Sequence, residues 1–106
     1  MPLTDAVDTG RCYNTSLGYQ RYLGHVNTTY SGRQCQRWDV DTPHSRNSYA
    51  QDQSMFPEGD LAAAENFCRN PDSDSTFWCY TADPGVRYEY CSIWACFENN
   101  GTNYII

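Results

Sequence analysis

The sequence predicts a small disulfide-rich domain, made mostly of loops with a few short antiparallel β-strands. The chain of 106 residues contains six cysteines, and an even number in a short, loop-rich chain indicates a disulfide framework. Turn-forming residues are dense, helical periodicity is almost absent, and aliphatic residues are scarce. Because such a chain cannot bury a large aliphatic core, disulfides worth ~3–5 kcal/mol each must supply part of its stability.

The length predicts a single domain. The cysteines extend from Cys12 to Cys96, so we assign the domain body to residues 12–96. We expect a flexible N-terminal tail at residues 1–11 and a C-terminal tail at residues 97–106, because both segments are largely polar and lack cysteine. No internal repeat is present, which argues against a solenoid.

Two elements of regular structure are predicted within the body. The segments 77–81 and 87–91 are rich in strand-forming aromatic residues and flank the turn sequence Asp83-Pro84-Gly85, which predicts a β-hairpin. One short helical turn is predicted over residues 60–67, where Asp60 can cap the N-terminus ahead of three alanines. The rest of the body is predicted to consist of loops.

The cysteine content indicates an oxidising compartment, so we expect a secreted or extracellular domain. The first residues have neither a basic start nor an apolar stretch, and we therefore expect the signal peptide to lie outside this sequence. Three N-x-[ST] sequons predict glycosylation at Asn14, Asn27 and Asn100. A cytosolic chain with reduced thiols is the alternative.

The charge distribution limits the classes of partner. The net charge is −6, there is no lysine, and the seven arginines are scattered, which argues against binding nucleic acid or an anionic membrane surface. No stretch approaches the length of a membrane span. An acidic domain attracts cationic partners, and we expect it to be a monomer.

Neither catalysis nor metal binding is predicted. His25 and His44 are the only histidines, no cysteine pair has the C-x-x-C spacing, and the nucleophile motif G-x-S-x-G is absent. We therefore expect no enzymatic activity, no metal site and no cofactor.

Several sequence blocks together resemble the kringle family: Gly32–Trp38 (GRQCQRW), Pro43-His44, Asn66–Asp72 (NFCRNPD), Trp78–Thr81 (WCYT) and Arg87–Cys91 (RYEYC). Spacing alone leaves all 15 pairings of six cysteines open. The resemblance implies the kringle fold and the bridges Cys12–Cys96, Cys35–Cys79 and Cys68–Cys91. The chain departs from the family in a longer stretch between His44 and Cys68, and in Phe77, which stands where proline is usual.

The resemblance also implies a lysine-binding site. A lysine side chain is a cation on an apolar stem, so its site needs carboxylates at one end and an aromatic trough, with a cation to meet a ligand carboxylate. The matching ligand-binding residues are the anionic pair Asp72 and Asp74, the trough walls Trp78 and Tyr88, the floor Tyr80, and the cations Arg87 and Arg46. The predicted ligands are lysine-containing proteins and lysine analogues such as 6-aminohexanoate.

Each assignment has a structural alternative. Aspartates after Asn70-Pro71 can simply form a turn, and aromatic residues can fill the core, a role that the resemblance gives to Trp38 and Tyr90. A histidine such as His44 is structural in the family. The longer loop after His44 can displace Arg46 or cover the pocket. In that case the domain would use another surface for protein contacts, as a module of a receptor, growth factor or protease.

Overall fold

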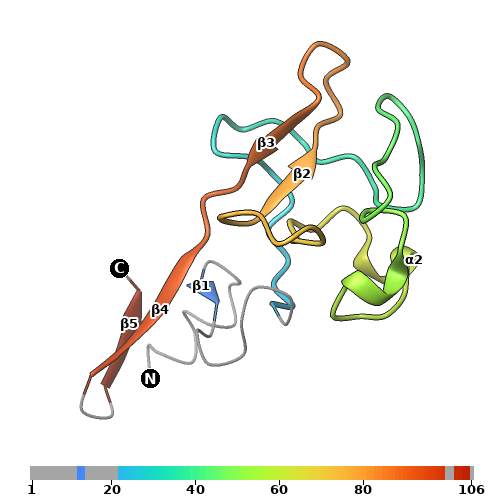
Figure 1. Cartoon of the computed structure of the whole chain (residues 1–106). Coiled ribbons are helices and arrows are strands. Elements are labelled where there is room, and N and C mark those ends of the chain that lie inside the picture. Colours follow the sequence, from blue (N-terminus) through green and yellow to red (C-terminus); the bar gives the residue numbers. More distant parts are fainter. Residues whose placement is uncertain (1–11, 14–21, 100–101, 106) are drawn as a thin grey trace.

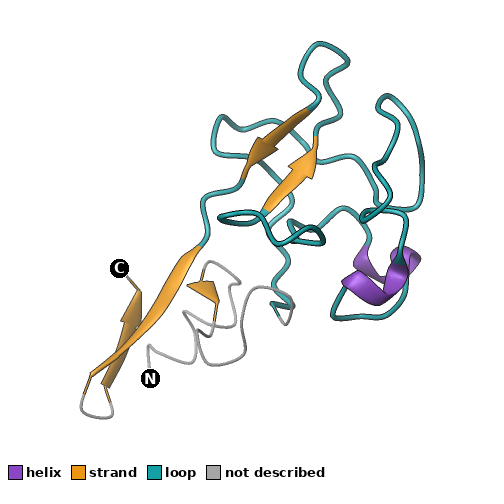
Figure 2. Ribbon diagram, in the orientation of Figure 1, coloured by secondary structure: helices purple, strands orange, loops and turns teal. Residues whose placement is uncertain are grey.

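The structure, a computed structural model, describes residues 12–13, 22–99 and 102–105. Loops make up most of it, and the regular elements are few and short (Figures 1 and 2). They are β1 (Cys12–Tyr13), the 3-10 helix η2 (Gln53–Met55), α2 (Leu61–Ala64), β2 (Trp78–Tyr80), β3 (Tyr88–Tyr90), β4 (Trp94–Asn99) and β5 (Thr102–Ile105). The predicted fold class, a small disulfide-rich domain made mostly of loops with a few short strands, is confirmed, although one strand pair, β1 with β4, is parallel.

Strands β2 and β3 form the predicted hairpin. They pair antiparallel, with Trp78 opposite Tyr90 and Tyr80 opposite Tyr88. The connecting turn is held by the Asp83 carboxylate, which accepts a hydrogen bond from the backbone N–H of Gly85 at 2.9 Å. All three residues of β2 are buried, whereas β3 is partly exposed. The hairpin therefore has one strand in the core and the other at the surface.

The predicted helical turn is α2, a single turn. The Asp60 carboxylate accepts a hydrogen bond from the N–H of Ala62 at 2.9 Å, as expected for an N-cap. Glu65 follows the last turn with a positive φ of 48°, and this non-helical conformation ends the helix. No helix among the described residues is long and apolar enough to cross a membrane.

A second sheet has the order β1-β4-β5, with β1 parallel and β5 antiparallel to β4. In Figure 1 it extends away from the β2–β3 hairpin. The C-terminal tail expected at residues 97–106 thus contains part of β4 and all of β5. The described part of this segment ends in Thr102-Asn103-Tyr104-Ile105, whose threonine, tyrosine and isoleucine favour strand pairing. The expected N-terminal tail lies outside the described residues.

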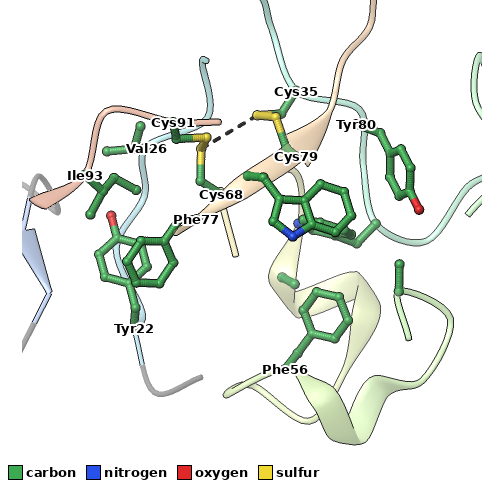
Figure 3. Close-up of a cluster of buried hydrophobic side chains, with 14 residues drawn as sticks. Tyr22, Val26, Cys35, Phe56, Cys68, Phe77, Cys79, Tyr80, Cys91 and Ile93 are labelled. Atoms are coloured by element: carbon green, nitrogen blue, oxygen red, sulfur yellow. Dashed lines mark hydrogen bonds between the residues drawn. A yellow bond between two sulfur atoms is a disulfide. The ribbon is translucent and has the colours of Figure 1, made fainter. Parts of the chain in front are cut away.

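Three disulfides hold the body together: Cys12–Cys96, Cys35–Cys79 and Cys68–Cys91. These are the bridges that the resemblance implies. The latter two lie next to each other in the core, with the Sγ atoms of Cys35 and Cys68 3.8 Å apart (Figure 3). Their four sulfurs lie within 4.8 Å of one another, but they are oxidised and therefore offer no thiolate to a metal.

Aromatic side chains surround the two central bridges. Trp38 is only 1% exposed, and its ring lies edge-on to those of Phe56 and Trp78, with centroid distances of 5.0 and 5.3 Å. Phe77, which replaces the usual proline of the family, is fully buried and packs on Tyr22 at 4.7 Å (Figure 3). The substitution therefore adds to the core without disrupting the hairpin.

A buried ion pair joins three segments of the chain. The Arg69 side chain is 1% exposed, and its Nε donates to Glu58 at 3.2 Å. Its Nη1 donates to the carbonyl oxygens of Gly24 and Cys68 at 2.9 and 2.8 Å. Neither partner was singled out by the sequence analysis, because nothing in the sequence indicates that Glu58 and Arg69 meet.

Candidate ligand-binding site

A cavity of about 230 Å³ opens beside the β2–β3 hairpin. It is lined by Asn47, Asp72, Asp74, Trp78, Tyr80, Arg87 and Tyr88. Six of these seven residues are among the ligand-binding residues that the sequence predicted. The cavity thus gathers side chains from the turn before β2, from both strands of the hairpin and from the loop after His44.

The turn that follows Asn70 places both carboxylates at the cavity. The Asn70 side chain accepts a hydrogen bond from the N–H of Asp74 at 2.7 Å and donates one to its carbonyl oxygen at 2.8 Å. Ser73, between the two aspartates, has a left-handed φ of 58°. Asp72 and Asp74 therefore form part of a turn and also line the cavity, so the two interpretations of this segment are compatible.

Two aromatic side chains donate hydrogen bonds to these carboxylates. The Trp78 Nε1–H donates to Asp72 Oδ1 at 3.0 Å. The Tyr90 hydroxyl donates to Asp74, with oxygen–oxygen distances of 3.1 and 3.2 Å. This hydrogen bond raises the pKa of Tyr90 above its usual range. The carboxylates are thus fixed in orientation before any ligand arrives.

The resemblance assigns Tyr90 to the core and gives no indication that its hydroxyl holds a carboxylate of the site. The tyrosine is in fact only partly buried and packs against the core from its edge. The spacing in β3 could have indicated the second role, since residues two apart in a strand point to the same face. Tyr88 lines the cavity, and Tyr90 is two residues after it.

The aromatic trough is formed by three rings in edge-to-face contact. The Trp78 ring centroid lies 4.9 Å from that of Tyr80 and 5.9 Å from that of Tyr88. Tyr88 is 50% exposed, whereas Trp78 and Tyr80 are each 3% exposed. Tyr88 therefore presents most of the accessible aromatic surface, while Trp78 and Tyr80 also belong to the core.

The cationic end of the cavity is Arg87, which is exposed and immediately precedes β3. Its guanidinium carbon lies 5.0 Å from the centroid of the Tyr80 ring, a cation–π geometry. The Tyr80 hydroxyl accepts a hydrogen bond from the backbone N–H of Asn47 at 2.8 Å. The floor of the cavity is thereby tied to the loop after His44.

Arg46, the predicted second cation, is not among the residues that line the cavity. Its Nε and Nη2 donate to the two carboxylate oxygens of Asp41 at 2.8 and 3.1 Å, and its Nη1 donates to the Trp38 carbonyl oxygen at 2.9 Å. The Arg46 guanidinium lowers the pKa of Asp41 to about 2. The position of Arg46 agrees with the alternative in which the longer loop displaces it, and its neighbour Asn47 lines the cavity.

The remaining predicted residues lie elsewhere. His44 is buried, and its Nε2 lies 2.9 Å from the Asp83 carbonyl oxygen, which supports the expected structural role. Asn27 is partly buried, and its glycosylation stays a prediction. Asn14 and Asn100 lie outside the described residues.

Comparisons with known proteins agree with the sequence resemblance. A family model described as Kringle domain matches residues 12–96. The chain is 39% identical over 94 residues to putative apolipoprotein(a)-like protein 2 of Homo sapiens, with 89% of this chain covered. It is 41% identical over 81 residues to plasminogen of Capra hircus, with 76% of this chain covered. The matches span 66% and 62% of the lengths of these two relatives.

Proposed function

The chain belongs to the kringle family of non-catalytic protein-binding modules, and on that premise we propose that it binds lysine side chains or C-terminal lysines of partner proteins. The observation that carries this proposal is the composition of one cavity. Two carboxylates, three aromatic rings and one guanidinium line a space of about 230 Å³. This set matches an ammonium group on an apolar stem.

The roles follow from the chemistry of the side chains. Asp72 and Asp74 would share the lysine ammonium, which has three N–H donors. The methylene groups would lie along the rings of Tyr88 and Trp78, and the guanidinium of Arg87 would meet a ligand carboxylate. None of these roles requires a metal or a cofactor.

We further propose that the domain works outside the cell as a monomer. Three disulfides among six cysteines are typical of an oxidising compartment. The acidic net charge of −6 attracts basic partners over long range, which accords with a lysine-rich binding partner. Glycans at Asn14, Asn27 and Asn100 belong to the same proposal, and mass spectrometry of the secreted protein tests them.

A titration with 6-aminohexanoate, followed by tryptophan fluorescence, tests the lysine site. We expect a Kd of ~10 µM to ~1 mM, because a ligand with so few atoms yields only a modest binding free energy. Trp78 lines the cavity, so its fluorescence should respond. The absence of a response at tens of millimolar would reject the lysine site and favour a kringle that contacts proteins through another surface.

Replacing Asp72 with asparagine tests the carboxylate pair. Asp72→Asn keeps the shape of the side chain but removes one of two charges that face the ammonium. We expect a loss of about 2–3 kcal/mol in binding free energy, or roughly 30- to 160-fold in Kd. The matched control is Asp39→Asn, which removes the same charge from an exposed pair with Arg37. Equal affinity of the Asp72→Asn and Asp39→Asn variants would show that Asp72 only forms the turn.

A further inference from the structure

We infer that the cavity recognises an internal lysine, flanked by peptide bonds on both sides, about as well as a lysine that bears a free carboxylate. This inference rests on the proposed lysine-binding function and narrows it to one class of partner, a polypeptide with an exposed lysine within its chain. It follows from the difference between the two ends of the cavity.

The anionic end is complete and pre-oriented. Asp72 and Asp74 are held by donors from Trp78 and Tyr90 at 3.0 to 3.2 Å. Asp72 uses its Oδ1 atom for the tryptophan, so Oδ2 faces no competing donor among the hydrogen bonds of the described residues. This end needs only an ammonium group, and every lysine side chain supplies one whatever the chemistry at its Cα atom.

The cationic end of the cavity carries less charge than the anionic end. Arg87 is the one cationic side chain among the described residues that line the cavity. It is exposed, and its guanidinium already lies over the Tyr80 ring at 5.0 Å. Because an exposed ion pair is screened by water, Arg87 should favour a ligand carboxylate by less than about fivefold in Kd.

The second arginine is held away from the cavity by bonds of its own. Arg46 makes a two-oxygen contact with Asp41 and donates to the Trp38 carbonyl oxygen. Its side chain is 14% exposed. To meet a ligand carboxylate, Arg46 would have to exchange a two-pronged ion pair for a new one, which yields little net gain. The positive charge of Arg46 is thus already paired with the Asp41 carboxylate before a ligand binds.

The negative net charge of the chain also reduces any advantage of a ligand with a free carboxylate. At −6, the long-range field of the chain attracts the ammonium group and repels a free carboxylate. An internal lysine presents the cation without the anion. The amide groups that flank an internal lysine are neutral, so the negative charge of the chain does not repel them.

Two ligands that differ in one group test this inference. Nα-acetyl-lysine has a free carboxylate, whereas Nα-acetyl-lysinamide carries a neutral amide and resembles an internal lysine. Titration of the intact chain with each, followed by fluorescence, should give Kd values within about fivefold of each other. A preference for the acid beyond tenfold would overturn the inference while leaving the proposed lysine site standing. If neither ligand binds at tens of millimolar, the lysine site itself fails, and the inference with it.

Two arginine variants locate the source of any preference. Arg46→Gln should leave the ratio of the two Kd values unchanged within about twofold, and Arg87→Gln should bring that ratio to about one. Arg37→Gln is the matched control, because Arg37 is another arginine paired with an aspartate, Asp39. The amide ligand also reports whether each variant remains folded, since it needs only the anionic end. A selective loss of acid binding in the Arg46→Gln variant would overturn the inference.

Discussion

Individual hydrogen-bond donors help to orient the carboxylates, and the Tyr90 hydroxyl acts on Asp74 together with the backbone N–H of Ser75, which donates to Asp74 Oδ1 at 2.7 Å. The Tyr90 hydroxyl contacts both oxygens of Asp74, and the raised pKa of Tyr90 reflects that contact. Tyr90 is a positioning residue in the proposed site, because it acts through Asp74. The tyrosine keeps its proton well above neutral pH, so the donor is present under all physiological conditions.

Tyr90→Phe should therefore weaken 6-aminohexanoate binding without unfolding the domain. The substitution keeps the ring and removes one hydrogen bond to a charged group, which we expect to cost about 1 kcal/mol in binding free energy, or roughly fivefold in Kd. Calorimetric titration measures this change. Tyr30→Phe, which alters a tyrosine that is 68% exposed, is the control and should bind normally. Unchanged affinity in the Tyr90→Phe variant would mean that Asp74 does not need this donor.

Asp41 shows how an ion pair gives a residue a distinct pH signature. Its folded-state pKa of about 2 lies below the ordinary value of 3.8, chiefly because of the hydrogen bond from Arg46. A lowered pKa means that the pair contributes stability at pH values above about 4, and that the contribution is lost as the pH falls toward 2.

A carboxyl NMR titration of the folded protein should therefore place the Asp41 midpoint near pH 2. Arg46→Gln should return that midpoint toward 3.8, and Arg37→Gln should leave it unchanged. Above about pH 4, where Asp41 is ionised and Arg46 is held by it, the ratio of acid to amide binding should not change with pH. An Asp41 midpoint near 3.8 in the unmodified chain would contradict the contact that keeps Arg46 away from the cavity.

At the scale of the element, the hairpin could be predicted because its signals are local. Asp83-Pro84-Gly85 forms the turn through hydrogen bonds within four residues, and aromatic residues favour strands on either side. The cap of α2 is equally local, since Asp60 bonds to Ala62. Six of the seven cavity-lining residues could also be named from sequence, because they lie within or next to the blocks that resemble the kringle family.

The loop between His44 and Cys68 could not be predicted to the same degree. Its conformation depends on contacts with distant residues: Asn47 donates to the Tyr80 hydroxyl, and Arg46 donates to the Trp38 carbonyl oxygen. Sequence spacing gives no sign of either contact. This explains why Arg46 was expected at the cavity and Asn47 was not. Strand β4 was missed for a related reason, since it pairs with β1, which is far away in sequence. Strand β5 pairs with the adjacent β4, and the Asn100-Gly101 sequence between them, a local hairpin signal, was overlooked.

At the scale of the whole molecule, the Arg69–Glu58 pair links the segment near Gly24, the loop before α2 and the chain leading into β2. Glu58→Gln would leave the buried guanidinium without its counter-charge. We expect a loss of about 3 kcal/mol in unfolding free energy, measured by chemical denaturation.

The matched control for Glu58→Gln is Asp39→Asn, which weakens the exposed pair between Arg37 and Asp39. This variant should cost less than about 1 kcal/mol, because water already screens that pair. Binding of 6-aminohexanoate by folded Glu58→Gln should be normal, since neither Glu58 nor Arg69 lines the cavity. Equal stability of the two variants would show that burial of the Arg69–Glu58 pair has no special importance.

The bridge between Cys12 and Cys96 has a mechanical consequence. The Cα atoms of these residues are 4.9 Å apart, although 84 positions separate them in sequence. Tension applied to the chain before Cys12 and after Cys96 would pass through the covalent bond and bypass everything between them. Fully extended, that enclosed stretch would reach roughly 290 Å, yet while the bridge is intact a pulling force cannot draw it out. The cavity and its hairpin would keep their shape while the polypeptide on either side is under strain.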